Sequence, residues 1–294
     1  MNYILSVLSG VLIAAMIVVN GGLTSQYGAW TATVIIHIVG LILISLILLF
    51  KREKTLLFKR LPFYLFTGGL IGVATTVFTN MAFGKISVSA ILALCLLGQT
   101  ITSLIIDRYG CFNMPKIPFH KMKLFGIVFV VLGILVMLSF FDISMFAAVI
   151  VSLLSGVTIV TARTVNARLA EETSVRISTF INYVTGLALS GAILAAVTSC
   201  GLEGGLALKF SLPSLWTYTG GMIGVAVVMI ANMITTKVPS FYMTLLLFIG
   251  QVFTGLLLDA ALTQTFSGRN LIGGVFVAIG LSVNIWIDKR SAAA

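Results

Sequence analysis

Ten stretches of about 20 residues, each without Asp, Glu, Lys or Arg, follow one another along the chain and limit what it can fold into. A helix of that length crosses the hydrocarbon core of a bilayer, which is about 30 Å thick, whereas a strand of a membrane barrel needs only about half as many residues. With 59% hydrophobic and 9% charged residues, the chain also lacks the polar surface that a soluble protein of 294 residues needs. The sequence therefore predicts an all-α polytopic membrane protein with ten transmembrane helices. The predicted spans are Tyr3–Val19, Trp30–Phe50, Leu61–Phe83, Ile86–Ile106, Leu124–Phe141, Ile143–Ala162, Ile177–Thr198, Leu212–Met233, Val238–Leu258 and Leu271–Ile287.

The basic residues gather in alternate loops between these spans. If successive spans cross in opposite directions, 14 Lys and Arg side chains lie on one side of the membrane, and only Lys85, Lys209 and Arg269 lie on the other. Cytoplasmic loops of membrane proteins carry the excess of Lys and Arg, so we expect both termini and the loop from Lys51 to Arg60 to face the cytoplasm. The net charge of +10 thus orients the chain in the cytoplasmic membrane and attracts anionic lipid. It does not indicate a nucleic-acid partner.

Cysteine and histidine patterns give no sign of a metal site, a cofactor or a catalytic centre. The three cysteines, Cys95, Cys111 and Cys200, have no CxxC spacing, and the two histidines, His37 and His120, are not part of an HExxH motif. We therefore expect no bound metal, no cofactor and no enzymatic activity.

The sequence repeats itself, and the repeat covers almost the whole chain. SVLSGVLIAAMIVVNGGL from residue 6 aligns without gaps with SLLSGVTIVTARTVNARL from residue 152, and TGGLIGVA from residue 67 returns as TGGMIGVA from residue 219. GQTITSLIID at 98–107 matches GQVFTGLLLD at 250–259, and LFGIVFVVLGILV from residue 124 matches LIGGVFVAIGLSV from residue 271. The chain therefore consists of two five-helix repeats, residues 1–141 and 142–294.

An odd number of helices in each repeat has a topological consequence. The second copy starts on the opposite side of the membrane from the first, so the two copies are expected to have inverted topology. Inverted repeats are typical of secondary transporters, in which the two halves exchange conformations.

These features resemble the drug/metabolite transporter superfamily, and most closely its YdcZ-type branch, here with two copies fused. The resemblance rests on the Ser, Gly and Asn pattern of the first span, on the GG-x-x-G of the third and on GQTITSLIIDRYG, which is the most specific stretch. It implies that spans one to four and six to nine enclose the substrate while spans five and ten lie at the periphery. In that branch a Gln often lies four residues before the first-span Asn. Met16 and Ala162 stand at these places here, so the role of that Gln is not carried over.

Two glutamines are the first candidates for the binding site. Gln99 and Gln251 lie near the middle of their predicted spans at equivalent positions, where an amide facing lipid would have no partner. Hydrogen bonding between helices is the simpler alternative. Because both glutamines lie at the depth where paired repeats form a central cavity, we predict that they contact substrate together with His37, Tyr183 and Asn182. His37 could act as a proton relay or could stay neutral and bond to a neighbouring helix.

Two carboxylates end their predicted helices on opposite sides of the membrane. Asp107 and Asp259 follow the two glutamines by eight residues, Asp107 at the cytoplasmic side and Asp259 at the outer side. Each is either a gate residue that pairs with Lys or Arg when its own side closes, or a solvated helix end.

The remaining polar positions have two interpretations each. Asn20 and Asn166 close the predicted first helices of the two halves, where we expect capping or interhelical bonding, with ligand contact as the alternative. Arg163, whose repeat counterpart is Ile17, either extends to the cytoplasmic interface or pairs with an anion or an Asp.

The sequence as a whole predicts a secondary active transporter that moves a small polar or amphiphilic metabolite by alternating access. A channel is the alternative, but it would need a continuous polar lining, and only scattered Gln, Asn, Thr and Ser occur in the spans. The sequence leaves open the substrate, the direction of transport, a coupled proton or counter-substrate, and whether the protein is a monomer or a homodimer.

Overall fold

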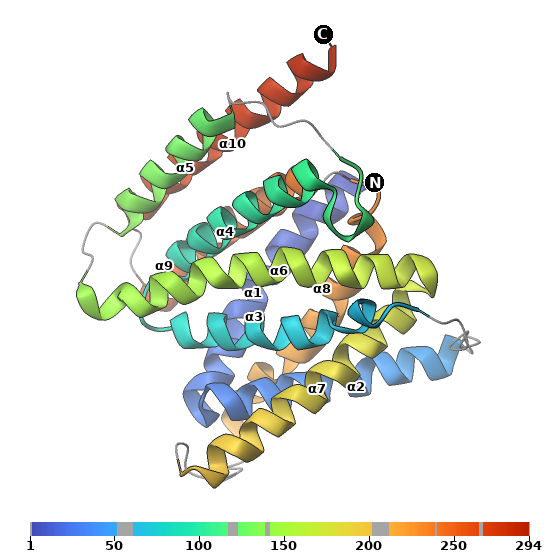
Figure 1. The fold of residues 1–294 in the computed structure, drawn as a ribbon. Helices are drawn as coiled ribbons and strands as arrows, with labels where there is room; N and C mark the ends of the chain where they lie inside the picture. The colour runs from blue at the N-terminus through green and yellow to red at the C-terminus, as the bar shows by residue number, and fades with distance from the viewer. Residues whose placement is uncertain are drawn as a thin grey trace.

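The chain folds into a bundle of long α-helices. The computed structural model describes residues 2–51, 61–116, 123–138, 142–201, 212–238, 240–264 and 267–293. Within these ranges the structure contains ten α-helices, one for each predicted span (Figure 1). The predicted loop residues Arg52 to Arg60, His120, Lys121 and Lys209 lie outside the described residues. The helices are α1 Asn2–Tyr27, α2 Ala29–Lys51, α3 Gly68–Ala82, α4 Val88–Tyr109, α5 Lys123–Met137, α6 Phe146–Glu172, α7 Val175–Ser199, α8 Gly220–Ile234, α9 Ser240–Thr263 and α10 Gly268–Ala293.

Local sequence signals set several helix ends. Ser87 precedes α4, and its side chain accepts a hydrogen bond from the backbone N–H of Ala90, while Ser174 does the same for Ile177 at the start of α7. Gly110 follows α4 with a φ of 66°, the left-handed conformation that commonly ends a helix. Short 3₁₀ helices at Phe63–Phe66 and Leu212–Thr219 lead into α3 and α8 at equivalent places of the two halves.

Eight of the helical segments in the described residues are long and apolar enough to cross a membrane. They comprise α1, α2, α4, α6, α7 and α9, together with α3 and α8 taken with the 3₁₀ turns before them. The helix α5 is shorter, with 15 residues, and α10 is not among the eight. The structure thus supports a multi-pass membrane protein, and the crossing of the membrane by α5 and α10 stays a prediction.

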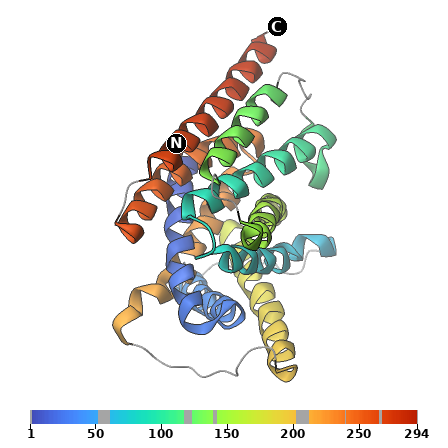
Figure 2. The same cartoon turned by 90° about the vertical axis from the view of Figure 1, so that its left-hand side faces the viewer.

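The packing of the helices follows the repeat. The contact of α1 with α9 has its counterpart in that of α6 with α4, and the contact of α1 with α8 has its counterpart in that of α6 with α3. Likewise α2 packs on α8 as α7 packs on α3, while the pairs α2–α7, α4–α9 and α5–α10 each join equivalent helices. Exchanging the two halves therefore reproduces each of these helix pairs. The α5–α10 pair lies at one edge of the molecule in both views (Figures 1 and 2).

Paired glycines let the helices of the two halves approach closely. A Cβ on Gly10 of α1 would lie 2.1 Å from the backbone oxygen of Leu247 in α9, and one on Gly156 of α6 would lie 2.0 Å from that of Cys95 in α4. Such distances allow backbone to lie against backbone only where the side chain is a hydrogen atom. The repeated glycines of the sequence thus mark helix crossings, which is why they recur at equivalent positions.

Candidate functional site

A cavity of about 150 Å³ lies between the two halves. Seven helices contribute to its lining, α1, α2 and α3 from the first half and α6, α7, α8 and α9 from the second. Most of its lining residues form pairs that are equivalent in the repeat, so the cavity lies where the two halves meet. Among these pairs are Ile13 and Ile159, Met16 and Ala162, Asn20 and Asn166, His37 and Tyr183, Gly72 and Gly224, and Thr76 and Val228.

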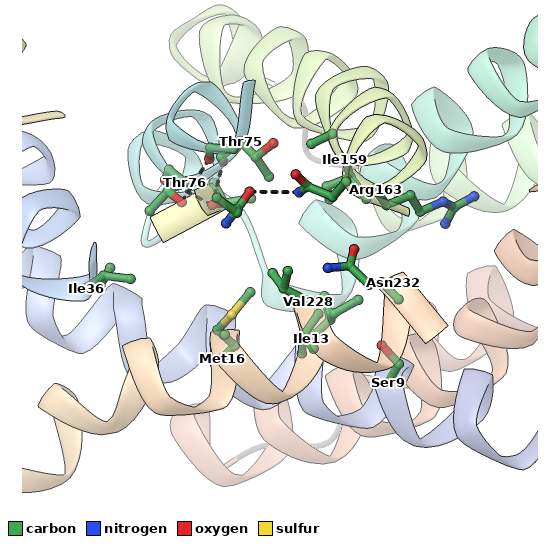
Figure 3. Close-up of a pocket in the computed structure, with 18 of the residues that line it drawn as sticks. Ser9, Ile13, Met16, Ile36, Thr75, Thr76, Ile159, Arg163, Val228 and Asn232 are labelled. Atoms are coloured by element: carbon green, nitrogen blue, oxygen red, sulfur yellow. Dashed lines mark hydrogen bonds between the residues drawn. The ribbon is translucent and has the colours of Figure 1, made fainter. Parts of the chain in front are cut away.

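Equivalent positions in the cavity carry different chemistry. The helix α3 presents Thr75, Thr76 and Thr79, while α8 presents Val227, Val228 and Ala231 at the corresponding places. Figure 3 shows Thr75 and Thr76 on one side of the cavity and Met16, Ile13 and Val228 on the opposite side. The α3 side of the cavity therefore presents three hydroxyl groups where the α8 side presents three apolar side chains, while Ser9, Asn20 and Asn232 add polar groups from α1 and α8.

One asparagine in the first helix of each half, Asn20 in α1 and Asn166 in α6, lies inside its helix and does not end it. The helix α1 continues past Asn20 to Tyr27, and α6 continues past Asn166 to Glu172, so the predicted capping role is wrong. Both side chains are buried against glycines that begin the third helix of the other half: Asn20 against Gly220, and Asn166 against Gly68. Asn166 also donates a hydrogen bond of 2.7 Å to Oδ1 of Asn182 in α7, which confirms the predicted interhelical bonding for this residue.

His37 and Tyr183 occupy the crossing of α2 and α7. Each ring packs against a glycine of the partner helix, His37 against Gly186 and Tyr183 against Gly40, and the ring centroids lie 5.8 Å apart. The Nδ1 atom of His37 lies 2.8 Å from the backbone oxygen of Thr33, which can only accept, so Nδ1 carries a hydrogen. The predicted bond of His37 is therefore made within its own helix and not to a neighbouring one.

Arg163 lies inside the bundle and does not extend to the membrane interface. Its side chain is 6% exposed, and its guanidinium group donates to Oγ1 of Thr244 at 2.7 Å and, at longer distances, to Gln99 and Ser103. Asp107 interacts electrostatically with it. In Figure 3 the guanidinium group points away from the cavity. Of the two alternatives for Arg163, the structure supports pairing with Asp, because α4 and α9 enclose the end of the side chain.

Gln99 and Gln251 do not line the cavity with the other predicted site residues. Each follows a crossing glycine, Gly98 or Gly250, and is fully buried where α4 meets α6 and where α9 meets α1. The Gln99 amide donates to Sγ of Cys95 at 3.6 Å and accepts from Arg163. Neither amide atom of Gln251 has a hydrogen-bond partner among the residues that the structure describes. The predicted cavity thus contains His37, Tyr183 and Asn182, but the glutamines lie behind its wall.

Asp107 and Asp259 are buried, with 5% and 8% of their surface exposed, so the solvated alternative is wrong for both. The carboxylate of Asp259 accepts hydrogen bonds from the backbone N–H groups of Val88 and Ser89, at 2.8 and 2.9 Å. Because α4 begins at Val88, a carboxylate from α9 of the second half holds the first turn of a helix of the first half. Both carboxylates therefore join helices of different halves.

Comparison with known protein families identifies the chain. A family model described as "Putative inner membrane exporter, YdcZ" matches it twice, over residues 1–136 and 147–283. The chain belongs to the YdcZ family. The two matches follow the two halves of the repeat, and the family description agrees with a membrane transporter.

Comparison with solved structures shows the fold that the YdcZ chain shares with others. A structure described as "Crystal structure of protein" covers 98% of this chain and 97% of its own at a TM-score of 0.71 and 14% identity, which establishes a common fold only. In all, 26 chains of solved structures match. No curated protein matches.

Several residues that line the cavity of this YdcZ protein were not among the predicted site residues. They include Ser9, Thr75, Thr76 and Asn232. The sequence contained a signal for three of them, because Thr75 and Thr76 interrupt an apolar span and Asn232 recurs from Asn80 in the repeat. The threonines Thr75, Thr76 and Thr79 lie on the side of α3 that lines the cavity.

Proposed function

We propose that this protein is a secondary active transporter that moves a small polar or amphiphilic metabolite across the cytoplasmic membrane. The observation that carries the proposal is the cavity at the junction of the two halves, which is lined mostly by equivalent positions of the repeat and presents both polar and apolar side chains. Its volume of about 150 Å³ is below the roughly 300 to 1,000 Å³ of sites for drug-sized ligands. A small solute fits this space.

The proposed mechanism is alternating access between two inverted halves. It is supported by helix contacts that stay the same when the halves are exchanged, and by the odd number of helices in each half. With inverted halves, each could adopt the conformation of the other, which would open the cavity to the opposite side.

Asp107 and Asp259 are the proposed gate residues of this cycle. Asp107 interacts with Arg163 of α6 towards the end that we place at the cytoplasm, and Asp259 joins α9 to α4 towards the other end. Contacts that exist in only one conformation stabilise that conformation by their differential free energy. Replacing Asp107 by Asn should therefore favour the inward-open form, as measured by distances between spin labels on the two halves.

The experiment that tests the function begins with a thermal-shift screen of metabolites, because a ligand at 100 times its dissociation constant stabilises the folded protein by about 2.7 kcal/mol. A solute found in this way is then offered, in labelled form, to liposomes containing the protein. A carrier gives saturable uptake that is stimulated by the same solute inside. Ohmic current without saturation would support a channel and would contradict the proposal.

A pair of variants ties transport to the cavity. Val228 lines the cavity, and Val184 is an exposed valine on the outer face of α7. Replacing Val228 by Trp should fill the cavity and abolish saturable uptake, whereas the same change at Val184 should leave it intact. Equal uptake by the two variants would show that the solute takes another path.

A further inference from the structure

Three buried polar side chains near one end of the cavity have hydrogen-bonding atoms without partners in the described part of the chain. They are the hydroxyl of Ser9, Oδ1 of Asn232 and both amide atoms of Gln251. Ser9 and Asn232 line the cavity, and Figure 3 shows them at the same end of it. Gln251 continues the row of Met243 and Leu247, which line the cavity at four-residue spacing on α9. Its backbone lies against Gly10, the residue after Ser9.

The side chains equivalent to Gln251 and Ser9 are bonded in the other half. Cys95 of α4 accepts hydrogen bonds from Gln99 and from Ser155, which are the counterparts of Gln251 and Ser9. Leu247 stands at the position that corresponds to Cys95, and it offers no acceptor. Ile17 stands at the position of Arg163, so the second partner of Gln99 has no counterpart either. Two substitutions between the repeats thus remove the partners that Gln251 would have, and one of them also removes the Sγ partner of Ser9.

Buried polar groups in folded proteins are almost always bonded, and those that are not commonly belong to a ligand or water site. The open groups here both donate and accept: the Gln251 amide does each, the Ser9 hydroxyl does each, and Oδ1 of Asn232 accepts. The complementary group is a hydroxyl or a primary amide.

The charges around the cavity favour an uncharged group at this end. No Asp or Glu lines the cavity within the described residues. The guanidinium group of Arg163 points away and is engaged by Thr244, Gln99, Ser103 and Asp107. A cation placed beside Ser9 and Asn232 would therefore lose its hydration without gaining a counter-charge, and an anion would have to displace the partners that the Arg163 guanidinium group already has.

We propose that the open groups of Ser9 and Asn232, which line this end of the cavity, together with the amide of Gln251, which lies behind the cavity wall beside Gly10, bind an uncharged hydroxyl or amide group of the transported solute. This inference rests on the proposed function, and it names the chemical class of the substrate: a small neutral molecule with an apolar body and one group that both donates and accepts hydrogen bonds. Water shares this chemistry, and the experiment below separates the two occupants.

The probes are benzamide, benzoate and benzamidine, which have nearly the same shape but are neutral, anionic and cationic. Binding to the purified full chain in detergent is titrated by saturation-transfer NMR, with protein-free micelles as the blank. We expect benzamide to bind in preference to both ions. Replacing Gln251 by Leu should weaken benzamide binding about tenfold, the equivalent of two hydrogen bonds of ordinary strength.

Asn284 supplies a matched control. Its side chain is also fully buried, and within the described part of the chain both of its amide atoms lack a partner, but it lies against Gly126 between α5 and α10, away from the cavity. Both Gln251→Leu and Asn284→Leu remove an unpartnered buried amide, so neither should lower thermal stability. Only Gln251→Leu should weaken the binding of benzamide.

Several results would overturn the inference. They are preferential binding of either ion, no binding of benzamide to the wild-type chain, and equal benzamide affinity in wild type and Gln251→Leu, which would leave water as the only occupant. Saturable solute uptake alongside any of these would leave the transport function standing. Conversely, Gln251-dependent benzamide binding in a protein that conducts without saturation would retain the site and reject the carrier.

Discussion

The bond between Asp259 and the start of α4 makes a measurable contribution to stability. The carboxylate accepts two backbone hydrogen bonds of 2.8 and 2.9 Å, and the residues that donate them, Val88 and Ser89, are 4% and 0% exposed. Water cannot replace the carboxylate in the folded protein because both donors are buried. Hydrogen bonds to charged groups are worth about 1.5 to 3 kcal/mol each. Asp259→Ala should therefore lower the free energy of unfolding by about 3 to 6 kcal/mol.

Asp259→Asn should cost about half as much, because the amide oxygen still accepts one bond while the amide NH₂ group faces the second donor. The measurement is equilibrium unfolding by SDS in mixed micelles, followed by circular dichroism. Glu171→Gln is the control, because the pair of Arg168 and Glu171 is partly exposed on α6 and should contribute less than about 1 kcal/mol. An Asp259→Ala variant within about 1 kcal/mol of the wild type would refute the argument.

Three further predictions concern the charge pair, the helix crossings and the orientation. Arg163→Ile should lower the free energy of unfolding by about 3 to 5 kcal/mol, since it leaves Asp107 buried without its cation, and adding Asp107→Asn should recover part of the loss in the same unfolding assay. Gly156→Ala should greatly reduce the yield of folded protein in size-exclusion chromatography, because its Cβ would meet the backbone of α4, whereas Gly191→Ala, with nothing within 4 Å, should leave it unchanged. A cysteine at Lys51 should resist an impermeant thiol reagent applied to intact cells, and labelling from outside would reject both the orientation and the inversion.

The sequence predicted the helices well where it relied on apolar length, and less well at their ends. The second predicted span, Trp30–Phe50, agrees with α2 at Ala29–Lys51 to within a residue at each end. The helices α1 and α6 run on beyond their predicted ends because Asn20, Arg163 and Asn166 are polar and yet buried. A hydropathy pattern ends at such residues, whereas a helix continues through them when neighbouring helices supply glycine surfaces and hydrogen-bond partners.

The sequence likewise predicted some of the residues that line the cavity and misplaced others. His37, Tyr183 and Asn182 line the cavity between the halves, and their predicted contact with substrate stays a prediction. Gln99 and Gln251 were assigned to the cavity on depth alone. Depth fixes the height of a side chain in the membrane but not its direction around the helix axis, and the glycine crossings turn both glutamines into the interfaces of α4 with α6 and of α9 with α1.

The amino-acid sequence by itself determined that the chain is helical, belongs in a membrane and consists of two similar halves, because apolar length and repeated motifs are properties of the chain alone. The tertiary structure decided which residues at equivalent positions of the two halves have different hydrogen-bond partners. Arg163 and Cys95 complete the bonds of Gln99, while Ile17 and Leu247 stand at the corresponding places and leave Gln251 without a partner among the described residues. Those residues lie far apart in the sequence, and only the packing of one half against the other brings them together, because a hydrogen bond depends on distance and direction in space.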